Sequence, residues 1–187
     1  MKKLIFALTA LCISAAGLFA QEQAAAKSEL RQLVNTPTAG VLGRGQYEFG
    51  MRLFANGGVL TNINVGISNR FMIGISYGGE NFIGTGKVNF NPEPGVDVRY
   101  RIIDESIIGP GVTVGFDNQG FGRYLKKIQP SDSTKVNRYS QKARGLFAAA
   151  SKNYAFMGNI GFHGGINWDV TEKKDKDNQL NFFLGVD

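Results

Sequence analysis

The stretch that decides the fold class reads NIGFHGGINWD, from Asn159 to Asp169. Its large apolar residues fall at alternate positions, at Ile160, Phe162, Ile166 and Trp168. The positions between them hold polar residues or glycine, at Asn159, Gly161, His163, Gly165 and Asn167. Side chains of an extended chain point alternately to two faces, so this pattern predicts a β-strand with one apolar and one polar face.

The same alternation recurs from residue 46 to the last residues of the chain. It marks eight segments: Gln46–Phe54, Asn62–Ser68, Phe71–Gly78, Val96–Ile102, Val112–Asp117, Ala143–Tyr154, Asn159–Asp169 and Gln179–Val186. In the sixth, alanines occupy both faces, which leaves its orientation open. No helical pattern separates the segments, and 25 of the 187 residues are glycine, above the usual ~7%. The sequence therefore predicts an all-β, antiparallel fold.

Two all-β architectures remain open. A soluble β-sandwich turns its apolar faces inward, whereas a transmembrane barrel turns them out to lipid and keeps polar residues and glycine inside. Here the polar faces are rich in glycine and carry few charges, as between Asn159 and Asn167. Aromatic residues stand near strand ends, at Phe71, Tyr77, Tyr154 and Trp168. These features favour an up-and-down transmembrane β-barrel, with about eight strands visible.

The connections between the predicted strands alternate in length. Short ones lie at Asn69–Arg70, Asp104–Pro110 and Ala155–Met157, and long polar ones at Gly79–Gly95, Asn118–Gln141 and Thr171–Asn178. Outer-membrane barrels have short turns at the periplasmic rim and longer loops outside. The first strand is therefore expected to run outward, which places the long connections at the exterior.

The first twenty residues have the pattern of a secretory signal peptide. Lys2 and Lys3 precede an uncharged apolar run from Leu4 to Ala20. A membrane anchor is the alternative, because a run of this length is at the short limit for a spanning helix. We expect residues 1–20 to be a signal peptide, 21–45 a periplasmic segment with a short helix over Ala24–Val34, and 46–187 the barrel, in the bacterial outer membrane.

Several polar residues face the predicted lumen. They are Glu48, Arg52, Asn62, Asn64, Asp97, Arg99, Arg101, Asn159, His163 and Asn167. Charges inside a narrow barrel need partners, so a structural network of ion pairs is one interpretation. A charged constriction that selects solutes is the other. His163 is interpreted as a hydrogen-bonded structural residue.

Most site chemistry is excluded by composition. The only cysteine, Cys12, lies in the predicted signal peptide, and His163 is the only histidine. Thiolate and multi-histidine metal sites are therefore not expected, nor is any cofactor. No nucleophile, base and orienting group fall at matched positions, so we expect no catalytic residues and no enzyme. A net charge of +6 without a basic cluster gives no reason to expect nucleic-acid binding.

Three segments carry motifs that can be compared with known proteins. Leu33 to Gly40 reads LVNTPTAG, which resembles the NTPTA-type entry that precedes the first strand in the YjbH-like bacterial outer-membrane β-barrel proteins. Phe71–Gly79 and Ser151–Gly165 (SKNYAFMGNIGFHGG) look like a related barrel group. The resemblance covers residues 33–187. It implies a channel or envelope component linked to exopolysaccharide production or export, and it brings no catalytic residues.

One departure from outer-membrane barrels concerns the final residues. Such barrels usually finish on a strand that ends in an aromatic residue, whereas this sequence ends Leu184-Gly185-Val186-Asp187. We therefore expect a fragment with more strands in the full-length protein. The expected partners are outer-membrane lipid, the barrel assembly machinery, and polysaccharide or small solutes. A secreted or periplasmic β-sandwich that binds a ligand or partner is the alternative function, and an outer-membrane enzyme is a third.

Overall fold

A computed structural model describes residues 29–125, 138–155, 159–170 and 179–187. These residues hold eleven strands: β1 (Tyr47–Phe54), β2 (Gly58–Ser68), β3 (Phe71–Glu80), β4 (Asn89–Phe90), β5 (Gly95–Ile103), β6 (Gly111–Asp117), β7 (Phe121–Leu125), β8 (Arg138–Gln141), β9 (Gly145–Ala155), β10 (Asn159–Trp168) and β11 (Leu180–Val186). Within the same residues, no helix has the length and apolar character needed to span a membrane.

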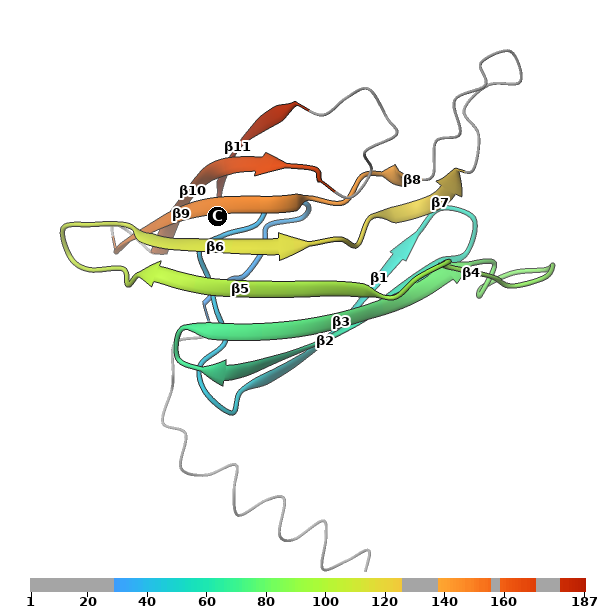
Figure 1. The fold of residues 1–187 in the computed structure, drawn as a ribbon, viewed down its shortest axis with the longest axis horizontal. Coiled ribbons are helices and arrows are strands. Elements are labelled where there is room, and N and C mark those ends of the chain that lie inside the picture. Colours follow the sequence, from blue (N-terminus) through green and yellow to red (C-terminus); the bar gives the residue numbers. More distant parts are fainter. Residues whose placement is uncertain (1–28, 126–137, 156–158, 171–178) are drawn as a thin grey trace, which may run out of the picture.

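Eight of these strands form one antiparallel sheet in the order β1-β2-β3-β5-β6-β9-β10-β11. The sheet curls into a half-barrel (Figure 1). The short strand β4 pairs with the end of β3, and β7 pairs with β8 as a separate two-stranded sheet. In the described part of the chain this hairpin is the only other sheet, and it is too small to form the second layer of a β-sandwich.

All eight predicted segments are confirmed as strands of the main sheet. Their order along the chain is also their order in the sheet, as an up-and-down topology requires. Sequence analysis missed β4, β7 and β8, which lie inside the two longest connections. These strands have only two to five residues, too few for an alternating pattern to stand out from a polar loop.

The two outer strands of the half-barrel each have one open edge. Among the described residues, β1 pairs only with β2, and β11 pairs only with β10. A closed barrel needs both edges to be paired. The described residues therefore provide a curved, half-closed wall.

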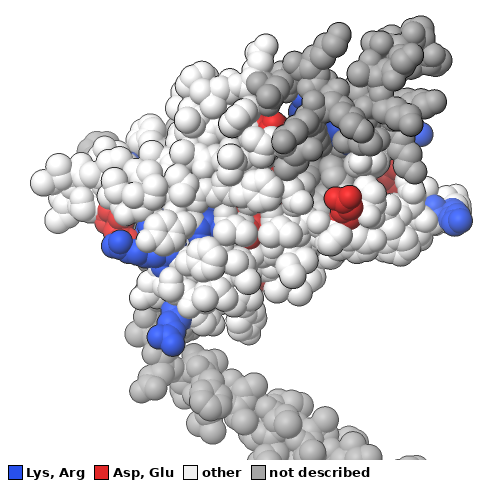
Figure 2. All heavy atoms as spheres, in the orientation of Figure 1, with Lys and Arg blue, Asp and Glu red and all other residues white. Residues whose placement is uncertain are grey.

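The two faces of this wall differ in polarity. The convex face carries exposed apolar side chains from every strand of the main sheet, such as Tyr47 (80% exposed) and Phe182 (78%). In Figure 2 this face is mostly white, and the charged side chains gather toward its ends. The concave face carries polar side chains, and two of them, Arg99 and His163, are only 2% and 5% exposed. A groove of about 460 Å³ on the convex face is lined mainly by apolar residues.

The register between neighbouring strands places one row of mostly polar residues across the concave face. Glu48 pairs with Asn64, Asn64 with Gly74, Gly74 with Asp97, and Asp97 with Asp117, across β1, β2, β3, β5 and β6. A side chain at Gly74 would collide with the amide of Asn64, so glycine makes room for its neighbour there. Asp97 and Asp117 are direct neighbours in this row and repel each other unless a cation lies beside them, whereas β2 and β3 separate Glu48 from Asp97.

Residues 29–40 form a finger that lies against the concave face, behind the strands in Figure 1. The chain turns back on itself at its tip, where Leu33 N–H donates to the Thr36 carbonyl at 3.0 Å. Thr38 N–H donates to the Arg31 carbonyl at 3.1 Å and closes the base. The expected helix over Ala24–Val34 is not found in its described part, because residues 29–34 are extended and bent. Residues 24–28 lie outside the described residues.

The buried core lies between the finger and the sheet. Thr38 and Ala39 of the finger are 0% and 2% exposed, and Met72, Thr113 and Ala149 of the concave face are similarly buried. The structure therefore shows which residues of β9 lie on the concave side, a question that the alanine-rich sequence left open. Ala149 lies on the buried concave side, where its small side chain lets the finger approach the sheet.

Candidate functional site

The finger is fixed to the sheet at Ala39. Its N–H donates to the Ser151 hydroxyl of β9 at 2.8 Å. Its carbonyl accepts from the Thr113 hydroxyl of β6 at 2.6 Å and from Arg101 of β5 at 2.9 Å. Each of these groups is buried, and buried polar groups are costly without partners. The sequence motif NTPTAG thus docks through its backbone, on three strands of the concave face.

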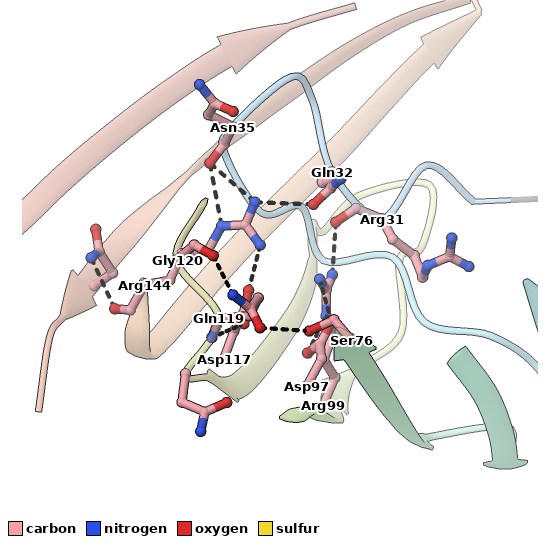
Figure 3. Close-up of polar contacts among 12 residues, drawn as sticks. Arg31, Gln32, Asn35, Ser76, Asp97, Arg99, Asp117, Gln119, Gly120 and Arg144 are labelled. Atoms are coloured by element: carbon pink, nitrogen blue, oxygen red, sulfur yellow. Dashed lines mark hydrogen bonds and ion pairs between the residues drawn. The ribbon is translucent and has the colours of Figure 1, made fainter. Parts of the chain in front are cut away.

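Two arginines, one in β1 and one just before β9, hold the tip of the finger. Arg52 of β1 donates to the Asn35 side-chain oxygen at 3.0 Å and to the Val34 carbonyl at 2.7 Å. Arg144, which precedes β9, donates to the Asn35 carbonyl at 3.2 Å and to the Gln32 side chain at 3.0 Å. Figure 3 shows the Arg144 guanidinium between Asn35, Gln32 and Asp117. The single residue Asn35 therefore joins two cationic side chains.

The carboxylates of the polar row are matched by arginines. Asp97 pairs with Arg99 at 2.9 Å, Asp117 with Arg144 at 2.8 Å, and Glu48 with Arg31 of the finger. Arg99 also donates to the Arg31 carbonyl at 2.7 Å. Burial, together with the nearby positive charge of Arg99, lowers the pKa of Arg31 to about 10, so Arg31 stays protonated at neutral pH. The finger is thus held by ion pairs as well as by its backbone.

Arg52 differs from these arginines. The ion pairs formed by the described residues give it no carboxylate partner; its hydrogen bonds go to neutral oxygens, and its guanidinium lies 4.4 Å from the centre of the Phe121 ring. Contact with an aromatic face stabilises a cation without neutralising it. Among the described residues, the charge of Arg52 is therefore less fully compensated than that of Arg31, Arg99 or Arg144, and Asp117 acts on it only from nearby.

A cavity of about 410 Å³ opens beside the fingertip. Its wall comes from β1, β2, β3, β5 and β6, from the finger, and from the segments on either side of the β7–β8 hairpin. The polar residues that line it are Arg31, Gln32, Asn35, Glu48, Arg52, Asn62, Asn64, Ser76, Asp97, Arg99, Asp117, Gln119, Gln141, Lys142 and Arg144. Its size suits a small organic molecule, and its lining offers many hydrogen-bond donors.

Six of the residues predicted to face a lumen line this cavity: Glu48, Arg52, Asn62, Asn64, Asp97 and Arg99. Arg101 lies elsewhere on the concave face and pairs with Glu29 of the finger. Asn167 donates to the Arg144 carbonyl at 3.0 Å. Asn159 begins β10, and its side chain lies outside the described set.

Ser151, His163 and Asp187 form a chain of polar contacts that sequence analysis did not identify. The His163 ring contacts the Ser151 hydroxyl at 2.8 Å through Nδ1 and the Asp187 carboxylate at 2.9 Å through Nε2. Serine, histidine and aspartate in this order resemble a nucleophile, a base and an orienting group. Here, however, Ser151 also accepts the Ala39 N–H, and neither the cavity nor the convex groove is lined by Ser151 or His163. These contacts between Ser151, His163 and Asp187 therefore anchor the finger to the sheet.

Arg31, Asp117, Gln119 and Arg144 are site residues that sequence analysis did not select. Asp117 falls on the inward face of a predicted strand and was detectable by its alternation. Arg31 and Gln119 lie outside the main strands, where no periodicity reports which way a side chain points. Arg144 lies in the predicted segment Ala143–Tyr154, whose alanines on both faces left the orientation open. Among the described residues, no group of three or more His, Cys, Asp or Glu is placed to hold a metal ion.

No family model, curated protein or solved structure matches this chain.

Proposed function

We propose that this protein is a bacterial outer-membrane β-barrel that acts as a channel or envelope component. The observation that carries the proposal is the inverted polarity of the half-barrel. Apolar side chains cover the convex face, while the concave face holds arginines and carboxylates. Monomers in water rarely leave an apolar surface of this extent exposed. Contact with the hydrocarbon of a membrane would bury it.

The aromatic residues near the strand ends support the same proposal. Tyr77, Tyr154 and Trp168 lie near the ends of β3, β9 and β10 and are 43%, 51% and 42% exposed. Tyrosine and tryptophan favour the boundary between hydrocarbon and water, where the ring is buried and its polar atom stays hydrated. Residues of this kind form the girdles of outer-membrane barrels.

The open edges of β1 and β11 indicate what the proposed barrel still needs. Unpaired backbone groups are costly in hydrocarbon, so both edges must be paired in a membrane. We propose that further strands, added between β11 and β1, close the wall. The expected partners are then outer-membrane lipid and the barrel assembly machinery.

We further propose that this barrel has a role linked to exopolysaccharide export. It rests on the resemblance of residues 33–187 to YjbH-like barrels and on the polar interior. The cavity lined by Asn62, Ser76 and Gln119 offers amides and a hydroxyl of the kind that bind sugar hydroxyls. Polysaccharide or small solutes are the proposed cargo.

Cell fractionation tests the location. We expect the mature protein in the outer-membrane fraction, resistant to salt and urea washes, and requiring detergent for extraction. In gel electrophoresis it should migrate faster before heating than after, because an unheated barrel stays folded. Recovery as a soluble protein after osmotic shock would contradict the proposal and favour a periplasmic binding protein.

A further inference from the structure

We infer that the cavity beside the fingertip is a binding site for a small polyhydroxy carboxylate, the chemistry of an acidic sugar, with Arg52 as the residue that binds its carboxylate. The inference rests on the proposed function and specifies the ligand class of the barrel interior. It depends on the charge of the cavity, the fixed position of Arg52 and the neutral donors around it.

The charge balance of the cavity favours an anion. Its described lining contains four arginines, Arg31, Arg52, Arg99 and Arg144, against three carboxylates, Glu48, Asp97 and Asp117. Lys142 also lines it but already has an interaction partner. Each carboxylate already pairs with an arginine. A bound anion would offset the excess positive charge in a partly enclosed space, where Coulomb interactions are stronger than in water.

Arg52 and Arg144 are fixed close to one another because both bind Asn35. The Arg144 charge is met by Asp117 at 2.8 Å. Among the described residues, Arg52 has hydrogen bonds to neutral acceptors and contact with the Phe121 ring, and Asp117 acts on it only as a nearby charge. A guanidinium carries five N–H donors, and the recorded bonds of Arg52 use its two terminal nitrogens. Donors therefore remain for a carboxylate, the anion that best fits the planar group.

Neutral polar groups complete the site. Asn62, Ser76, Gln119 and Gln141 line the same cavity. The Ser76 hydroxyl lies 3.3 Å from the Gln119 side-chain oxygen. Amides and hydroxyls both donate and accept hydrogen bonds, which is the requirement for binding vicinal hydroxyls. The volume of about 410 Å³ accommodates one sugar unit. A purely inorganic anion would leave these groups unused.

Calorimetric titration of the detergent-solubilised full chain tests the inference, with glucuronate, glucose and inorganic phosphate as probes. We expect glucuronate to bind at least tenfold more tightly than either glucose or phosphate. Arg52→Gln should weaken glucuronate binding at least tenfold and leave the weak glucose binding unchanged. Equal binding of glucose and glucuronate would overturn the role of charge, and phosphate binding as tight as glucuronate would overturn the role of the hydroxyls.

Arg70→Gln is the matched control. Arg70 lies in the β2–β3 turn, pairs with exposed Asp104 and does not line the cavity, so glucuronate binding should be unchanged. Heat-dependent gel mobility reports whether each variant is folded. If Arg52→Gln is not folded, Gln141→Ala is used in its place, and it should weaken the binding of glucuronate and of glucose by the same factor. A protein that resides in the outer membrane but does not bind glucuronate would refute the site alone, whereas a soluble protein would refute the proposed function.

Discussion

Ala39 is the residue on which the buried polar contacts converge. Its N–H and carbonyl are both satisfied by side chains of the sheet, from Thr113, Ser151 and Arg101. Such contacts are directional, and they specify position more strictly than apolar packing does. A small side chain at this position lets the finger backbone reach the sheet, so Ala39 sets how deeply the finger enters.

Removing one of these contacts should destabilise the protein measurably. Thr113→Val keeps the shape of the side chain but deletes the bond to the Ala39 carbonyl, which keeps its bond from Arg101. We expect a loss of about 1 kcal/mol in the free energy of unfolding, measured by urea titration in lipid vesicles with the fluorescence of the single tryptophan, Trp168.

Thr61→Val provides the comparison. The Thr61 hydroxyl also donates to a carbonyl, that of Tyr77 at 3.0 Å, but it lies on the more exposed convex side. In the proposed barrel this side meets lipid, where valine is at least as favourable as threonine, so the free energy of unfolding should fall by less than about 0.5 kcal/mol. Equal losses from the two substitutions would mean that the finger contact adds no more stability than a hydroxyl on the convex face.

At the scale of an element, β3 shows how one strand serves two environments. Ile73 and Ile75 are on the convex side and are 40% and 62% exposed, whereas Gly74 and Ser76 are on the concave side and are less exposed. The pleat alone separates these positions. A register shift of one residue would exchange the two faces, so the apolar stripe also fixes which polar residues meet inside.

Two substitutions in β3, one on each face, test this assignment of the faces. Ile73→Arg should destabilise the protein by roughly 2–4 kcal/mol if the convex face meets lipid near the membrane centre. Ser76→Arg should cost less than half as much, because Ser76 lines the polar cavity. The measurement is urea unfolding in vesicles. A larger loss at Ser76 than at Ile73 would contradict the assignment of the two faces.

At the scale of the whole molecule, the connections have different lengths at the two rims of the half-barrel. The β3–β5 connection spans residues 81–94, whereas the β2–β3 turn is two residues. The β6–β9 connection contains the β7–β8 hairpin, whose Phe121 lines the cavity. Antiparallel order places these two long connections at the same rim. In the proposed barrel this rim faces outward.

Cysteine labelling tests the proposed orientation. Thr85 lies in the β3–β5 connection, and Ile107 lies at the other rim and is 98% exposed. Thr85→Cys should react with a membrane-impermeant maleimide on intact cells, and Ile107→Cys only after the outer membrane is opened. The reverse result would invert the topology, and labelling of both on intact cells would exclude a spanning barrel.

The sequence alone determined the eight strands of the main sheet and, except in β9, which of their side chains share a face. Alternation is a local property, because neighbouring side chains of an extended chain must point to opposite sides. It therefore located β1, β2, β3, β5, β6, β9, β10 and β11 and placed residues such as Asn64 and Arg99 on the polar face.

Only the tertiary structure decided what fills the interior. The finger docks through contacts between residues far apart in sequence: Ala39 and Ser151 are 112 positions apart, and Ala39 and Thr113 are 74. Residues 29–34 carry no periodicity that marks them as extended, and their conformation is fixed by the partners they meet. The same docking brings Arg31 to Glu48 and Asn35 to Arg52. The local sequence pattern specifies the face of the sheet on which a side chain lies. Which side chain it meets across the cavity depends on how the whole sheet curves.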